Sequence, residues 1–122
     1  MKIYSFEKLR FWDELRELIK EVYLITKSYP DDEKFGIVSQ MRRSAVSISS
    51  NIAEGSSRIS SKDQSHFYQI AYSSLMELLS QFIVSEDLGY CLKEETKVIR
   101  TQIEKISIQI NALRKAQLNK VK

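Results

Sequence analysis

The chain has 122 residues, of which 43% are hydrophobic and 29% are charged, a balance that excludes a disordered protein and fits one globular domain. Its three glycines and single proline argue against a fold of strands and turns, and its single cysteine excludes an internal disulfide bond. The net charge of +3 is too small to indicate a nucleic-acid partner by itself.

Two helices are expected in the first half of the chain. The apolar periodicity predicts a helix over about residues 7–27, which ends before Pro30 because proline disfavours helical geometry in the preceding residue. A second helix is predicted over residues 32–57, with Asp31 or Asp32 as its N-cap. The short connection between them predicts that the two helices run antiparallel.

The third helix has a clear predicted start and end. It covers residues 62–88 and is preceded by Ser60 or Ser61, with Ser61 and Gln64 at the spacing of a capping box and Gly89 as a left-handed terminator. Its expected inner stripe consists of Phe67, Ala71, Ser74, Leu78 and Phe82.

A fourth helix is predicted over residues 93–116, where apolar residues recur at alternating steps of four and three. This seam consists of Ile99, Ile103, Ile106, Ile110 and Leu113. Four long amphipathic segments with short connections close most simply as an all-α, antiparallel up-down-up-down four-helix bundle. We expect the whole chain, residues 1–122, to form this single domain.

The second predicted helix carries two organised faces. Its apolar face consists of Val38, Met41, Ala45, Ile48 and Ile52. The other face, here called the polar ladder, consists of Gln40, Arg43, Ser47, Asn51, Glu54 and Arg58. The two faces lie roughly 140° apart, and the ladder's side chains make directional hydrogen bonds. The ladder is therefore interpreted either as a contact between subunits or as a binding groove edged by Arg42, Arg43 and Arg58, while the plainer alternative is an internal ion-pair ladder that keeps the helix soluble.

Positive charge is concentrated at the end of the chain. Residues 1–92 carry 11 basic and 13 acidic groups, whereas residues 93–122 carry eight basic and three acidic groups. Arg114 and Lys115 belong to this basic end. They are candidates for phosphate contacts, and the alternative is an ordinary solvated helix end, where cations suit the helix dipole.

The usual catalytic and metal-binding sets are missing from the sequence. His66 is the only histidine, and Cys91 has no second thiol near it, so we expect no enzyme, no metal site and no cofactor. The first 15 residues contain no apolar run, which predicts neither a secretory signal nor a membrane span. A cytoplasmic location is expected by default.

The segment Gln40–Gly55 resembles the hallmark block of a known family. The block Q-x-R-R-x-A-x-S-I-x-x-N-I-A-E-G is matched by Gln40, Arg42, Arg43, Ala45, Ser47, Ile48, Asn51, Ile52, Ala53, Glu54 and Gly55. Further matches are Trp12, Tyr23, Pro30, Glu33, Phe35 and Gly36 before the block, and Arg58, Phe67, Ala71, Ser74, Glu77, Leu78, Leu88 and Gly89 after it. Over about residues 6–113 the chain thus resembles the bacterial four-helix-bundle proteins encoded in intervening sequences of 23S ribosomal RNA genes. That fold group includes the accessory variability protein of diversity-generating retroelements.

The resemblance implies a ring-like homo-oligomer, typically a pentamer. For the retroelement branch it also implies binding to nucleic acid and to a reverse transcriptase. Carried over to this chain, it makes Arg43, Asn51, Glu54 and Arg58 the leading site candidates.

The expected function is that of a non-enzymatic, homo-oligomeric accessory protein that binds RNA or DNA. Its nucleic-acid-binding candidates are Arg42, Arg43, Arg58, Arg114 and Lys115. Tyr68 and Tyr72 are the aromatic residues expected outside the core, and no stacking platform is evident among them. The alternative function is a protein–protein assembly or adaptor module without nucleic-acid binding.

Overall fold

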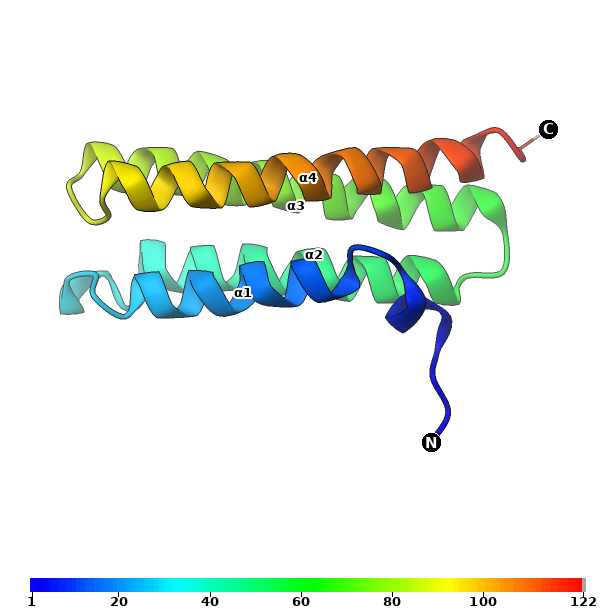
Figure 1. Ribbon diagram of the computed structural model, residues 1–122, viewed down its shortest axis with the longest axis horizontal. Helices are drawn as coiled ribbons and strands as arrows, with labels where there is room; N and C mark the ends of the chain where they lie inside the picture. Colours follow the sequence, from blue (N-terminus) through cyan, green and yellow to red (C-terminus); the bar gives the residue numbers. More distant parts are fainter. Residues whose placement is uncertain (122) are drawn as a thin grey trace.

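The computed structural model describes residues 1–121, which form four long α-helices and two short 3-10 helices. The elements are η1 (Ser5–Lys8), α1 (Trp12–Thr26), η2 (Asp31–Glu33), α2 (Ile37–Ser57), α3 (Ser61–Asp87) and α4 (Lys93–Leu118). Successive helices run in opposite directions (Figure 1), each packs against the next, and α4 closes against α1. The predicted all-α four-helix bundle is confirmed, and the alternating directions are those of an up-down-up-down arrangement.

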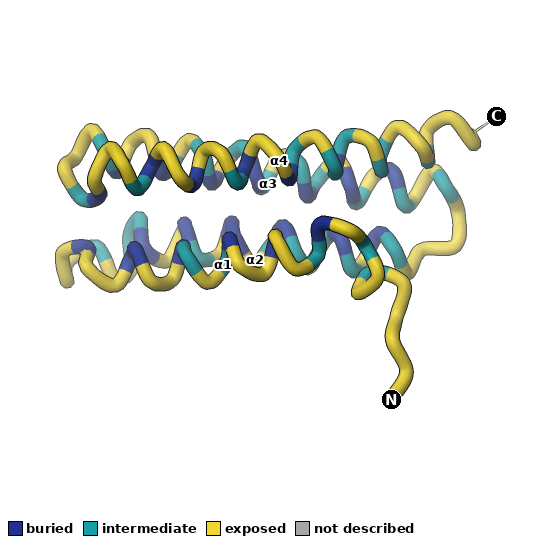
Figure 2. Tube along the Cα trace, viewed as in Figure 1, coloured by how far each residue is buried: buried dark blue, intermediate teal, exposed yellow. Residues whose placement is uncertain are grey.

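Each helix contributes one apolar stripe to a common core (Figure 2). The largest fully buried side chains are Leu15, Leu18, Met41, Ile48, Ile52, Leu75, Leu78, Phe82, Ile99, Ile103, Ile106 and Ile110. Burying such aliphatic and aromatic side chains is the main source of stability for a helical bundle, because each removes apolar surface from water. Among residues 1–121, no helix combines the length and the apolar character needed to cross a membrane.

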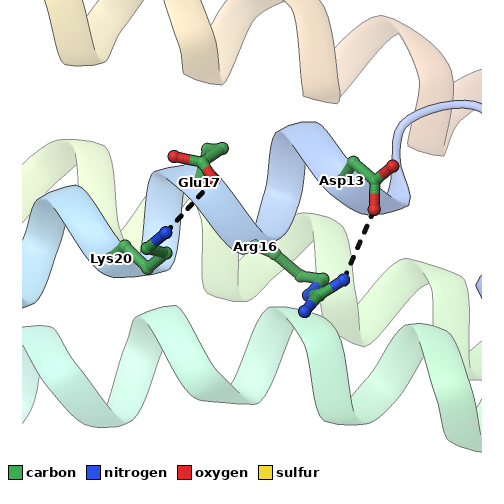
Figure 3. A network of polar contacts seen from close by, with 4 residues as sticks. All are labelled: Asp13, Arg16, Glu17 and Lys20. Atoms are coloured by element: carbon green, nitrogen blue, oxygen red, sulfur yellow. Dashed lines mark hydrogen bonds and ion pairs between the residues drawn. The ribbon is translucent and has the colours of Figure 1, made fainter.

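The solvent face of α1 carries short-range ion pairs. Arg16 Nη1 lies 3.5 Å from Asp13 Oδ1, and Lys20 Nζ lies 3.4 Å from Glu17 Oε1 (Figure 3). All four side chains are mostly exposed, so each pair contributes little to folding. The two ion pairs nevertheless neutralise the positive charges of Arg16 and Lys20.

The first two helices begin later than the sequence predicts. The helix predicted from residue 7 starts at Trp12, because the chain at Leu9 is extended after the short helix η1. The helix predicted from residue 32 starts at Ile37, because Asp31 and Asp32 form η2 and Gly36 departs from helical dihedral angles. Neither aspartate caps α2, so the predicted N-cap is wrong.

The inner stripe of α3 is shifted from the predicted one in its first half. Tyr68 is only 2% exposed and belongs to the core, whereas Phe67 and Ser74 are half-buried. The reason is Gly55, which has no side chain: a Cβ placed there would lie 2.7 Å from Tyr68 Cε1. The tyrosine ring occupies that space, and its hydroxyl lies 3.0 Å from the hydroxyl of Ser56.

The ends of α3 are set by a serine and a glycine. The Ser60 hydroxyl accepts a hydrogen bond from the Asp63 backbone N–H at 3.1 Å, which makes Ser60 the N-cap. The predicted capping box of Ser61 and Gln64 is wrong, because the Gln64 side chain donates instead to the Arg58 carbonyl oxygen at 2.7 Å. Gly89 has a φ of 76°, which confirms its predicted role as the left-handed residue after α3.

Candidate nucleic-acid interface

The middle of the polar ladder meets α3 of the same chain. The hydroxyls of Ser47 on α2 and Ser74 on α3 lie 3.0 Å apart. The Asn51 amide donates to the Ser47 carbonyl at 2.8 Å and to the Ser47 hydroxyl at 3.1 Å. One turn earlier, the Ser44 hydroxyl donates to the Glu77 carboxylate of α3. These bonds satisfy the central part of the ladder within the chain and align the two helices.

The two ends of the polar ladder face solvent. Gln40 and Arg43 are exposed, and Arg43 makes no hydrogen bond or ion pair within residues 1–121. At the other end, Arg58 Nη2 lies 3.5 Å from Glu54 Oε1, and the Arg58 guanidinium lies 4.5 Å from the centroid of the Phe67 ring. The ladder is therefore a bonded centre between two open, charged ends.

Arg42 ties α2 to α1. Its Nε donates to the Thr26 hydroxyl at 3.0 Å, and its Nη2 donates to the Tyr23 carbonyl oxygen at 3.3 Å. The guanidinium also stacks on the Tyr23 ring, with its central carbon 4.6 Å from the ring centroid. These contacts hold the positive charge in place at the surface, so Arg42 is at once a structural residue and a fixed cation.

Arg42 and Arg43 share a hollow of about 460 Å³ between α1 and the start of α2, here called the basic hollow. It is lined by Tyr23, Lys34, Phe35, Ser39, Arg42, Arg43 and Val46. An adjoining hollow shares Lys34 and Arg42 and adds Lys27 and the carboxylate of Asp31. Four basic side chains thus face one acidic side chain across this surface, which gives it a positive potential.

The connection that carries Lys34 and Phe35 is anchored from its inner side. The Tyr90 hydroxyl donates to Glu33 Oε2 at 2.8 Å, and this hydrogen bond to a carboxylate raises the pKa of Tyr90. The Tyr29 ring packs 5.5 Å from the Tyr90 ring, and burial raises the pKa of Tyr29 well above its ordinary value. These contacts fix the backbone of the connection, so Lys34 and Phe35 are held in place on its outer side.

The predicted nucleic-acid-binding residues divide between the two ends of the bundle. Arg42 and Arg43 lie near the start of α2, and Arg58 lies 15 residues beyond Arg43, about 22 Å along the helix. Arg114 and Lys115 lie near the end of α4, at the same end of the bundle as the last turn of α2 (Figure 1). Arg114 is half-buried, and its Nη2 donates to Asn111 Oδ1 at 3.5 Å. The structure therefore brings Arg42 and Arg43 into one hollow but not all five candidates.

Sequence reasoning missed the aromatic part of the basic hollow. Tyr68 was expected outside the core but is buried, and Tyr72 is half-buried. Phe35 is instead 90% exposed, directly beside Lys34. The sequence does hold a signal for this site: Phe35 lies outside the apolar periodicity of both neighbouring helices and directly follows a lysine.

The chain matches the family model of the 23S rRNA-intervening sequence protein over residues 7–112. It belongs to this family. No curated protein matches the chain.

The family match includes the polar ladder and the basic hollow, and it ends before Arg114 and Lys115. Those two cations are therefore features of this chain outside the matched part of the intervening sequence protein family. Within residues 1–121, no group of three or more histidine, cysteine, aspartate or glutamate side chains is placed to hold a metal ion.

Proposed function

We propose that this member of the 23S rRNA-intervening sequence protein family is a non-enzymatic, homo-oligomeric accessory protein that binds RNA or DNA. The observation that carries the proposal is the basic hollow, where Lys34, Arg42 and Arg43 converge from the α1–α2 connection and the first turns of α2. Closely placed cations on one surface attract the phosphate backbone of nucleic acids and release its counterions.

The state of these cations supports a role in binding. Arg16 and Lys20 on α1 are each paired with a carboxylate, whereas Arg43 is exposed and unpaired within residues 1–121. Arg42 is held in place by Thr26 and Tyr23, so its charge is already oriented before a ligand arrives. A fixed guanidinium loses less side-chain entropy on binding a phosphate than a free one does.

Oligomerisation would strengthen weak binding by each copy. Several copies of one basic hollow on a single assembly raise the effective concentration of each site for the same strand. The family resemblance adds two expectations to the proposal: five subunits, and, from the retroelement branch, a reverse transcriptase as a protein partner.

A second candidate function is an assembly module that binds other proteins but no nucleic acid. The exposed ion pair of Glu54 and Arg58 favours it, since charged groups arranged along one helix end can match a partner surface. In that case the polar ladder is the functional surface, and the basic hollow has no phosphate ligand.

The test is oligonucleotide binding at about 50 and 200 mM salt, compared between the native protein and the double variant Lys34→Ala/Arg43→Ala. We expect the affinity of the native protein to fall steeply with salt. If each side chain neutralises one phosphate of a single strand, the double variant lowers the slope of log K against log[salt] by about 1.4. Arg42 is left intact because its removal would also loosen α1 from α2.

The matched control is Arg16→Ala/Lys20→Ala, which removes the same charge from α1, where both cations are paired (Figure 3). This control is expected to keep the native salt slope. Absence of oligonucleotide binding at low salt, or equal effects of the two double variants, would contradict the proposed nucleic-acid site and favour the assembly module.

A further inference from the structure

Phe35 is the most exposed aromatic side chain among residues 1–121. It is 90% exposed, although the connection that carries it is anchored by the hydrogen bond between Tyr90 and Glu33. The phenyl ring therefore adds almost nothing to the core and keeps a large apolar surface in water. Tyr23 and Val46, which are also exposed, line the same hollow, and apolar surface rimmed by polar groups marks a binding site where several such side chains adjoin.

The Phe35 ring is surrounded by positively charged side chains and by the planar groups of an arginine and a tyrosine. Lys34 Nζ lies 5.6 Å from the centroid of the Phe35 ring. Across the same hollow, the Arg42 guanidinium is stacked on Tyr23, and Arg43 is exposed. Aromatic rings and arginine planes are the surfaces on which unpaired bases stack, while lysine and arginine bind the adjoining phosphates.

We infer that the basic hollow is a stacking site for an unpaired base, so that the nucleic acid it takes is single-stranded. This inference rests on the proposed function and narrows its ligand. In a duplex each base already stacks on its neighbours, and the Phe35 ring would have to displace one of them. In a single strand the faces of the bases are available, and the hollow of about 460 Å³ opens to solvent, so a base can reach the Phe35 ring.

The charge balance favours a nucleic acid over an apolar protein segment in this hollow. Lys34, Arg42 and Arg43 line it and no carboxylate does, while the adjoining hollow adds one cation, Lys27, and one carboxylate, Asp31. An apolar peptide would bury these cations without partners, which is costly. A strand with one phosphate per nucleotide pairs with them while a base covers the phenyl ring.

The experiment measures the anisotropy of a labelled oligouridine, an oligothymidine and a duplex of equal length, with the native protein and Phe35→Leu. Leucine keeps the apolar bulk of the side chain and removes the aromatic face. We expect Phe35→Leu to weaken single-strand binding by about 5- to 150-fold, the loss of one base–aromatic stack, and to leave duplex binding unchanged. Phe35→Trp should restore single-strand binding, and its added fluorescence should be quenched when oligouridine binds.

The matched control is Tyr4→Leu. Tyr4 is a second exposed aromatic residue with a lysine over its ring, since Lys2 Nζ lies 5.0 Å from the ring centroid, but it lies outside the hollow. Loss of single-strand affinity in Phe35→Leu but not in Tyr4→Leu supports the stacking site.

Three results would overturn the inference, and they separate it from the proposed function. If Phe35→Leu binds single strands normally while Lys34→Ala/Arg43→Ala does not, the stacking site is wrong and the phosphate site stands. If Phe35→Leu instead lowers the mass of the assembly in light scattering, the ring belongs to a contact between copies. If the native protein binds neither strands nor duplex at low salt, both proposals are wrong.

Discussion

At the scale of single residues, the buried end of the α1–α2 connection contains an unusual tyrosine. The Tyr29 hydroxyl is buried beside Ser85 and Cys91 but forms no hydrogen bond of good geometry within residues 1–121, whereas the nearby Tyr90 hydroxyl donates to Glu33. An unpaired buried hydroxyl lowers stability, because it loses its hydrogen bonds to water. Two neighbouring tyrosines thus have opposite consequences for folding.

Removing the Tyr29 hydroxyl is expected to leave the protein at least as stable as the native one near pH 7. Tyr29→Phe should raise the free energy of unfolding by up to about 1 kcal/mol, since the ring stays and an unpaired polar group goes. Urea unfolding followed by circular dichroism measures the change. Tyr90→Phe is the matched control and should lower stability, because it deletes a hydrogen bond that is formed.

The same pair predicts how stability depends on alkaline pH. Burial raises the pKa of Tyr29, and the hydrogen bond to Glu33 raises that of Tyr90, so the folded state holds both protons more tightly than the unfolded state. This contribution is complete below the unfolded tyrosine pKa of about 10 and is lost as pH rises through the folded values. Urea unfolding between about pH 9 and 11 should show a shallower decline in Tyr29→Phe than in the native protein; an identical decline would show that Tyr29 does not titrate differently in the two states.

At the scale of the helices, a close contact between α2 and α3 depends on Gly55. A Cβ at this position would lie 2.7 and 2.9 Å from two ring carbons of Tyr68 and 3.1 Å from Phe67 Cβ. Glycine is a poor helix former, so its place in the last turn of α2 is explained by packing and not by propensity.

Gly55→Ala is expected to lower the free energy of unfolding by about 1–3 kcal/mol, because the added methyl group overpacks the contact with Tyr68. Chemical denaturation measures the effect. Gly89→Ala is the comparison: no atom lies within 4 Å of its Cβ position, so its cost of about 1 kcal/mol comes from its positive φ alone. A stabilised Gly55→Ala would mean that helix propensity outweighs the close packing.

The elements show which parts of the fold were predictable. The bounds of α3 and α4 lie within two residues of the predicted ones, because long apolar seams and Gly89 mark them. The starts of α1 and α2 were wrong because η1 and η2 depend on local backbone turns that helical periodicity does not encode. The stripe of α3 was misplaced at Phe67 because Tyr68 fills space left by Gly55, a tertiary relation between two helices.

The candidate site was only partly predictable for a similar reason. The polar ladder lies on one helix, so its period was visible, and the basic character of Arg42 and Arg43 was recognised. The basic hollow combines Tyr23 of α1 with Lys34 and Phe35 of the connection, which meet only when α1 packs against α2. The spacing of these residues in the sequence does not indicate that they lie together in the fold.

At the scale of the whole molecule, the centre and the two ends of the polar ladder differ in whether they are free to contact another copy. Its centre is satisfied by α3, so a contact between copies would use its open ends, including the Glu54–Arg58 pair. If this pair contacts another subunit, reversing both charges preserves the pair within the chain but mismatches the neighbour.

Light scattering of the native protein is expected to give a multiple of the 14.3 kDa chain mass. Glu54→Lys/Arg58→Glu should reduce that mass without loss of helicity. The reversed pair Asp13→Lys/Arg16→Glu on α1 is the matched control and should leave the assembly intact. A native monomer, or a normal assembly in the first variant, would contradict a subunit contact through this part of the ladder.

The even number of helices has a practical consequence for reporters and tethers. Both ends of the described chain lie at the end of the bundle where α2 meets α3, opposite the turn that carries Phe35 (Figure 1). The 21 residues of α2 put about 30 Å between the two ends. A dye, a surface linker or a fused protein attached at either end of the described chain therefore lies away from the hollow and leaves it unobstructed.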